Sequence, residues 1–221
     1  MPLSGEVYVG TSGWAYSWNP DGLEWYAKYS GLNAVEVNST FYRMPTKSAV
    51  DRWRSVGAAL RWSVKVYRYI THVKRLADPS PWREFKSVVE PLRPDFYLFQ
   101  LPPQFKCDEE RLRRIEPLAE ELGPRAAVEF RDPSCYERPR ELGVTIVSID
   151  SPIGVYLVDN DGVVYLRMHG RAAWYAYEYS EEELREIARA LEDLSPKKVY
   201  VFFNNDHAML DNARALLRLL K

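Results

Sequence analysis

The chain has 221 residues, of which 46% are hydrophobic and 28% charged, so it can bury a globular core, and disordered, collagen-like and fibrous classes are excluded. Lys and Arg number 30 and Asp and Glu 31, which excludes a protein that holds nucleic acid or anionic lipid by bulk charge alone. No segment resembles a signal peptide or a membrane span, so we expect a cytoplasmic protein without a membrane partner. Gln is rare whereas Pro, Arg and Glu are frequent, which predicts a thermophilic source.

Short β-branched and aromatic runs alternate along the chain with longer segments of helical period. The predicted strands are, in chain order, VYVGTS (7–12), AVEVNS (34–39), RWSVKV (61–66), DFYLFQ (95–100), AAVEF (126–130), TIVSID (145–150), VVYLRMHG (163–170) and VYVFFNN (199–205). Helices are predicted over 46–56 with Thr46 as N-cap, over 108–122, over 181–194 with a capping box of Ser180 and Glu183, and over 206–221. Strand then helix, repeated, predicts parallel pairing through right-handed crossovers.

Eight parallel strands with helices outside them define a TIM-type (β/α)8 barrel, and we expect one such domain over residues 1–221. Between Asp150 and Arg167 the turn-forming DNDG (159–162) separates GVYLV from VVYL, which predicts a hairpin in place of the sixth helix. The rival architecture, an open doubly wound sheet, needs a Gly-rich phosphate loop after the first strand. GTSGW at 10–14 does not match that loop, so we favour the barrel.

Polar residues of the predicted strands share one face. Glu36 and Asn38 oppose Val35 and Val37, for example, and the later strands alternate in the same way. The apolar face must pack on helices, so the polar face points into the barrel and gathers at the carboxyl ends, where barrel enzymes place their chemistry. We expect a site there made of Glu36, Asn38, Lys65, Gln100, Glu129, Arg131, Asp150, Arg167, His169, Asn204 and Asn205. The alternative is a self-neutralising ion network that only fills the mouth.

The loops after the same strand ends are rich in aromatic and basic residues. Trp14, Tyr42 and Trp174 are the aromatic ligand contacts that we expect, and Arg43 and Arg171 add positive charge. An aromatic rim over polar groups suits a sugar ring or a nucleobase. The cations favour a phosphate or another anion, so the predicted partner is a small anionic or sugar-like ligand.

A series of motifs runs in order along nearly the whole chain: GTSGW (10–14), EVNSTFYRMP (36–45), SVKVYRYITH (63–72), FQLPPQF (99–105), VEFRDPSCY (128–136), YLRMHGR (165–171) and VFFNND (201–206). Together they resemble the YecE-like family, a domain of unknown function that is number 72 in its series. The resemblance implies a fold similar to TIM barrels and the same inward-facing set of polar residues. It implies no reaction.

These residues predict acid/base chemistry, hydrolytic or isomerising, on a sugar, nucleotide or phosphorylated ligand. Glu36 and Glu129 are the candidates for proton transfer, with His169 as a second acid or base. Lys65 would stabilise charge or form a Schiff base, and Arg131 and Arg167 would clamp the anion.

Three alternatives stay open at this point. Mg or Mn, held by Glu36, Glu129 and Asp150, is the metal that such a site would favour, although no cofactor is predicted. The other possible functions are a nucleic-acid-binding or phosphodiester-processing barrel and a non-catalytic small-molecule sensor.

Cys107 and Cys135 are too few for a disulfide framework, but a bridge between them would agree with a thermophilic source. The oligomeric state is left open.

Overall fold

The computed structural model describes residues 3–137 and 142–221. The chain forms two compact units. The first unit contains Met1–Glu36, Val56–Arg61 and Ser148–Lys221, and the second contains Val37–Ser55 and Trp62–Val147. The single domain predicted over residues 1–221 stays a prediction.

The sheet of the first unit is built mainly from parallel strands. Strand β1 (Glu6–Ser12) pairs in parallel with β2 (Ala34–Val37) on one side and with β10 (Lys198–Phe203) on the other. Strand β10 pairs with β9 (Val163–Met168), β9 pairs with β7 (Ser148–Ser151), and β7 pairs antiparallel with β8 (Gly154–Tyr156). Gly10 allows β1 to approach β2 closely, because a Cβ there would lie 2.1 Å from the carbonyl oxygen of Ala34.

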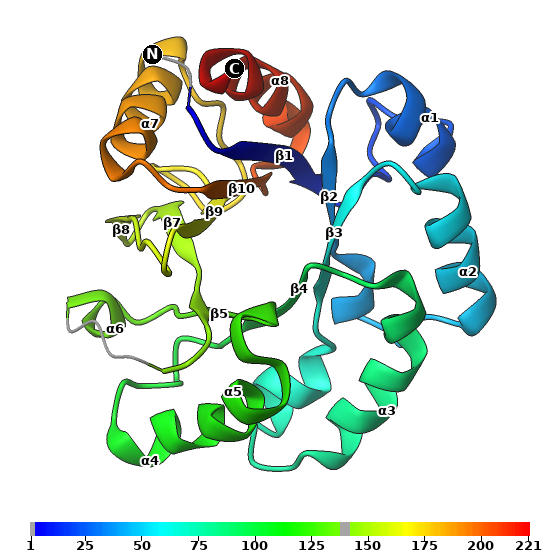
Figure 1. Ribbon diagram of the computed structural model, residues 1–221, viewed down its shortest axis with the longest axis vertical. Helices are drawn as coiled ribbons and strands as arrows, with labels where there is room; N and C mark the ends of the chain where they lie inside the picture. Colours follow the sequence, from blue (N-terminus) through cyan, green and yellow to red (C-terminus); the bar gives the residue numbers. More distant parts are fainter. Residues whose placement is uncertain (1–2, 138–141) are drawn as a thin grey trace. The chain divides into compact units, whose positions relative to one another are not determined.

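The α-helices described in the first unit are α1 (Gly22–Tyr29), α7 (Glu181–Leu194) and α8 (Met209–Leu220). Helix α7 begins at the predicted capping box, in which Ser180 and Glu183 each satisfy the backbone N–H of the other. Helix α8 packs on β1 and β10 with α7 beside it (Figure 1), and Leu3 N donates a hydrogen bond to Leu220 O at the end of α8.

The second unit has a parallel sheet of four strands in the order β3 (Arg61–Lys65), β4 (Phe96–Gln100), β5 (Ala126–Glu129) and β6 (Thr145–Ile146). The residues Val56–Arg61, which include the first residue of β3, belong to the first unit. The helices described in the second unit are α2 (Lys47–Val56), α3 (Ser80–Val89), α4 (Glu109–Leu112), α5 (Glu116–Leu122) and α6 (Ser134–Glu137). β4 and β5 are buried along their whole length, as in parallel sheets covered on both faces.

Two predicted elements are interrupted in the structure. The predicted strand 145–150 is divided at Val147, since β6 pairs with β5 whereas β7 pairs with β9. The predicted helix 108–122 is divided into α4, a 3-10 turn and α5. Pro117 lies in the first turn of α5 and has no N–H for a bond to the preceding turn, which explains the interruption.

The segment that was expected to replace the sixth helix differs in its pairing. Residues 151–162, all described, contain no helix, as predicted. The hairpin is nevertheless formed by β8 folding back on β7, with Ser151 opposite Gly154, and not across the DNDG turn. That turn closes a single bridge between Asn160 and Val163, because β9 uses its edges for parallel pairing with β7 and β10.

A disulfide joins Cys107, in the loop after β4, to Cys135 of α6, with the two Cα atoms 5.4 Å apart. Both residues lie in the second unit, and Cys135 is buried. The bridge that the sequence left open is therefore present.

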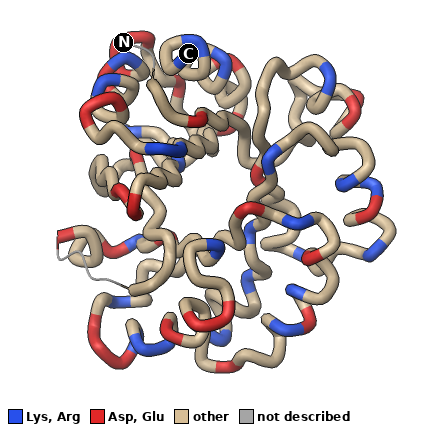
Figure 2. The backbone as a smooth tube through the Cα atoms, viewed as in Figure 1, with Lys and Arg blue, Asp and Glu red and all other residues tan. Residues whose placement is uncertain are grey.

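Charged residues of both signs alternate along the helices of each unit (Figure 2), in keeping with the near-zero net charge. Within residues 3–137 and 142–221, no helix has the length and apolarity needed to cross a bilayer.

Candidate active site

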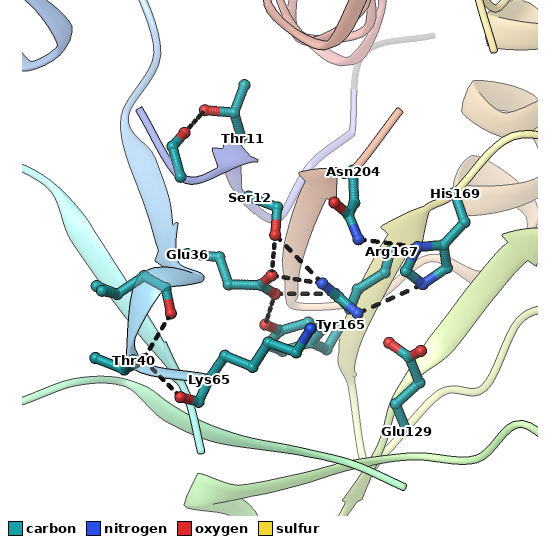
Figure 3. A network of polar contacts seen from close by, with 12 residues as sticks. Thr11, Ser12, Glu36, Thr40, Lys65, Glu129, Tyr165, Arg167, His169 and Asn204 are labelled. Atoms are coloured by element: carbon teal, nitrogen blue, oxygen red, sulfur yellow. Dashed lines mark hydrogen bonds and ion pairs between the residues drawn. The ribbon is translucent and has the colours of Figure 1, made fainter. Parts of the chain in front are cut away.

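A buried ion pair between Glu36 and Arg167 forms the centre of the polar cluster in the first unit (Figure 3). Glu36 comes from β2 and Arg167 from β9, and both side chains are fully buried. The guanidinium binds the carboxylate through two atoms, with Nη2 2.6 Å from Oε1 and Nε 3.0 Å from Oε2. Ser12 Oγ donates to Oε1 at 2.5 Å and Tyr165 Oη to Oε2 at 2.7 Å. Both carboxylate oxygens are thus held by two donors each, which fixes the negative charge in place.

His169 follows β9 and lies beside this pair, on the same face of the chain as Tyr165 and Arg167. Its Nε2 is 3.5 Å from Arg167 Nη1, and its Nδ1 is 3.3 Å from Asn204 Nδ2. The guanidinium offers only donors, so a hydrogen bond between them uses the lone pair of Nε2. The rings of Trp174 and Tyr175 cover His169 at centroid distances of 5.3 and 5.8 Å.

Asp150 belongs to a different network from the Glu36–Arg167 pair. Its Oδ1 accepts a hydrogen bond from Tyr179 Oη at 2.8 Å and its Oδ2 one from Arg171 Nε at 3.0 Å. Arg171 also bridges to Glu186 of α7 at 2.7 Å. Burial raises the pKa of Asp150 above its ordinary range, while Tyr179 and Arg171 oppose that shift. These contacts anchor both ends of the loop that carries Trp174.

Gly170, at the start of that loop, has a φ of 97°, and a Cβ there would lie 2.4 Å from Tyr177 Cβ. Its N–H donates to Tyr179 Oη at 2.7 Å. Asn205 acts in the same part of the structure, since its Nδ2 donates to Tyr177 O and to Asn212 Oδ1, both at 2.8 Å. In these contacts Asn205 supports the loop. Trp14 is half-buried after β1, and its carbonyl oxygen accepts from Asn19 Nδ2.

Glu129 and Arg131 form the corresponding buried ion pair of the second unit. Arg131 Nε lies 2.6 Å from Glu129 Oε1, with side chains 6% and 0% exposed. Gln100 ends β4 directly opposite Glu129 in the β4–β5 register and is also buried. The carboxyl ends of β4 and β5 thus bring together three of the predicted residues.

Lys65 ends β3 with its Nζ 4.1 Å from the ring centroid of Phe41, a cation–π contact, and its side chain is buried. Thr40 Oγ1 lies 2.6 Å from the carbonyl oxygen of Lys65 and ties the loop after β2 to the end of β3. His72 meets the same Phe41 edge-on at 5.0 Å. His72 is half-buried, and Lys65, Arg68 and Arg131 are the cations that act on it.

Burial, and then the positive charges of Lys65, Arg68 and Arg131, lower the pKa of His72 from 6.5 to about 4. The unfolded chain therefore takes up a proton on His72 between pH 6.5 and 4 that the folded chain excludes, so folding stability is lost as the pH falls through this window. We expect wild type to lose about 1–2 kcal/mol more than His72→Gln over it, allowing for solvent screening of a half-buried ring. Urea denaturation at both pH values measures this difference, and parallel pH curves for the two proteins would contradict it.

Two predicted ligand contacts of the second unit are less enclosed. Asn38 is half-buried at the end of β2, and its carbonyl oxygen accepts from Phe41 N. Tyr42 is 63% exposed and meets Phe41 edge-on. Neither residue shows a contact that restricts it to a structural role.

Ser12 and Tyr165 are members of the Glu36 network that the sequence interpretation left out. Tyr165 has the same strand parity as Arg167 and His169, so the alternation rule would have included it. A tyrosine in a strand is an ambiguous signal, because its ring is apolar and only its hydroxyl reaches the carboxylate. Ser12 ends β1, where a small residue gives a weak signal.

Within the described part of the chain, no group of three His, Cys, Asp or Glu side chains is arranged to hold a metal ion. Glu36 and Asp150 are each bound by an arginine, and Glu129 by Arg131. The Mg or Mn site stays a prediction.

Comparison with known proteins supports the predicted fold class. A sequence model described as a protein of unknown function DUF72 matches residues 8–221. The crystal structure of a DUF72 family protein from Thermotoga maritima has a TM-score of 0.83 at 30% identity, covering 98% of this chain and 99% of that one. One from Enterococcus faecalis has a TM-score of 0.79 at 21% identity, covering 97% and 95%. No curated protein matches.

A fusion protein of a xylose isomerase-like TIM barrel with 4-hydroxyphenylpyruvate dioxygenase is similar in fold alone, with a TM-score of 0.58 at 15% identity, covering 97% of this chain and 42% of that one. The predicted α/β fold of TIM-barrel type is therefore confirmed. The predicted number of strands is not, since the structure has strands β1 to β10.

Proposed function

The chain belongs to the family of proteins of unknown function DUF72, and we propose that it is an enzyme that performs acid/base chemistry on a small anionic or sugar-like ligand. The observation that carries this proposal is the fully buried Glu36–Arg167 pair with His169 beside it, at the carboxyl ends of β2 and β9. In barrels of this type that end of the strands carries the chemistry.

A purely structural role accounts less well for this cluster. A buried ion pair adds little net stability, and apolar side chains of similar volume often replace one without loss. Here Glu36, Arg167 and His169 are all fully buried together with Ser12. A titratable ring next to a fixed ion pair is an arrangement that active sites use to set proton affinity.

We assign the proton transfer to His169, because it is the imidazole ring that lies beside the Glu36–Arg167 pair. Hydrolysis and isomerisation both use such a group, as a base towards water or towards a carbon-bound proton.

Glu36 receives a different role from the one the sequence predicted. Both of its oxygens are occupied by donors from Ser12, Tyr165 and Arg167, so we assign it to orienting the guanidinium. Asp150 is likewise assigned as a positioning residue for the loop that carries Trp174. The roles predicted for Lys65, Glu129 and Arg131 stay predictions for the second unit.

Two other predictions belong with this proposal. A non-catalytic sensor would bind the same ligand without turnover.

A cytoplasmic location agrees with the Cys107–Cys135 disulfide if the source is thermophilic, since intracellular disulfides are common in hyperthermophiles.

A thermal-shift screen tests the proposal with phosphorylated sugars, nucleotides, neutral sugars and Mg or Mn salts. A true ligand at about 100 times its Kd stabilises the folded state by about 2.7 kcal/mol. For a chain of this size that raises Tm by about 5–10 °C. Conversion of the hit is then followed by mass spectrometry or NMR.

The matched variant is His169→Asn, which keeps a polar side chain and removes the titratable ring. We expect it to abolish turnover while the melting temperature without ligand stays within a few degrees of wild type. Lys65→Met and Arg131→Lys test the second unit separately. A hit whose turnover is unaffected by His169→Asn would overturn the assignment, and a hit bound without turnover would favour the sensor.

A further inference from the structure

A ladder of aromatic rings runs over the first unit from Tyr16, whose Oη donates to Ser12 O at 3.0 Å, to Tyr29. The ring centroids of Tyr16 and Trp18 are 5.5 Å apart, those of Trp18 and Trp25 6.3 Å, and those of Trp25 and Tyr29 6.4 Å. Tyr16 and Trp18 lie in the loop after β1, and Trp25 and Tyr29 lie one turn apart on α1. The ladder ends at Tyr29, which is 56% exposed.

The exposed end of the ladder borders a basic pocket of about 520 Å3. The pocket is lined by Tyr29, Ser30, Gly31, Arg214, Leu217, Arg218 and Lys221. Arg214 and Arg218 are one turn apart on α8, and Lys221 follows on the same side of the helix. The volume falls in the range of ligand clefts.

The position of this pocket is fixed by backbone contacts. Arg214 Nε donates to Ser30 O at 2.7 Å and its Nη2 to Tyr29 O at 3.0 Å, which holds α8 against the end of α1. Lys28 adds a further cation, 5.0 Å from the Tyr29 ring centroid. The acidic residues of these two helices are Glu24 and Asp211, so cations outnumber acids on a protein that is slightly negative overall.

We propose that this α1/α8 surface, made of Trp25, Lys28, Tyr29, Arg214, Arg218 and Lys221, binds single-stranded nucleic acid. Proteins that hold single strands without sequence preference combine a positive groove for the backbone with aromatic rings on which bases stack. In this proposal a base stacks on the exposed part of the Tyr29 ring, and Arg218 and Lys221 contact the flanking phosphates.

Contacts that stabilise the helices explain part of this arrangement of aromatic rings and cations, but they do not explain all of it. An aromatic pair four residues apart stabilises a helix, and cations near a helix C-terminus interact well with its dipole. Neither effect requires Tyr29 to be half exposed at the edge of a pocket, or the cations to gather on the side of α8 that faces it. Neutral oligosaccharides also stack on aromatic rings, but they gain nothing from the cations.

The test is fluorescence anisotropy with a labelled oligothymidine of about 20 nucleotides at low salt. We expect binding, and a Kd about 5- to 100-fold weaker for Tyr29→Ala. Arg218→Ser/Lys221→Ser removes two phosphate contacts, so the slope of log Kd against log salt should fall by about 1.4. Arg214 is left unchanged because it supports the backbone.

The matched control is Arg113→Ser/Arg185→Ser, which removes two exposed arginines. Arg113 lies in the turn after α4 with its side chain 73% exposed, and Arg185 lies on α7 with its side chain 55% exposed. It should bind as wild type does. The proposal is overturned if the oligonucleotide fails to bind at low salt, or if the control weakens binding as much as the α8 double variant. Salt-independent binding of a neutral oligosaccharide that Tyr29→Ala abolishes would overturn it in favour of a sugar surface.

Discussion

Glu36→Ala is expected to lower the free energy of unfolding by about 3–5 kcal/mol, because it leaves the guanidinium of Arg167 buried without its carboxylate. Ser12 and Tyr165 would lose their acceptor in the same substitution. Urea denaturation of both proteins at neutral pH measures the difference. The cost is mainly that of an uncompensated buried charge and not the net value of the ion pair.

A double variant separates the cost of an uncompensated buried charge from the net value of the ion pair. Glu36→Leu/Arg167→Met removes both charges and fills the space with apolar atoms, so we expect it to be more stable than Glu36→Ala. Ser12→Ala is the matched control, since it removes one donor and should cost only about 1 kcal/mol. A Glu36→Ala variant within 1 kcal/mol of wild type would show that the pair is hydrated and that the burial argument is wrong.

Loss of the Cys107–Cys135 disulfide is expected to cost about 3–4 kcal/mol. The two cysteines are 28 residues apart, and opening the bridge restores the conformational freedom of that loop in the unfolded chain. Cys107→Ser/Cys135→Ser should therefore melt well below the oxidised wild type. The melting temperatures with and without reductant measure the effect.

Reduced wild type is the control for this second prediction, because it should melt near the double variant. A thiol titration of the denatured, unreduced protein should find no free thiol. Two free thiols, or equal melting temperatures for oxidised wild type and the double variant, would contradict the presence of the bridge.

The alternation of strands and helices made most of the fold predictable. Eight predicted strands overlap strands of the structure, and the capping box of α7 marked its first residue. The division of the predicted strand at Val147 was less visible, because it depends on pairing between distant segments. Which neighbour β6 and β7 choose on either side of Val147 is decided by tertiary contacts and leaves the local pattern unchanged.

Strand parity also predicted much of the candidate site. It placed Glu36 with Arg167, and Glu129 with Gln100. It could not assign the hydrogen-bond partners, so Asp150 was grouped with Glu36 and Arg167, although its own partners are Tyr179 and Arg171. Parity says which face a side chain takes, whereas its role depends on which donors reach it.

Histidine ring NMR tests the central claim most directly, because the chain has only three histidines and each has a different environment. His169 is fully buried in the candidate active site, His72 is half-buried in the second unit, and the side chain of His207 is 74% exposed. Saturation with the ligand found by thermal shift should move the His169 signal, identified by its loss in His169→Asn, and leave His207 in place. An unmoved His169 signal at full occupancy would contradict the claim that the buried polar cluster is the site.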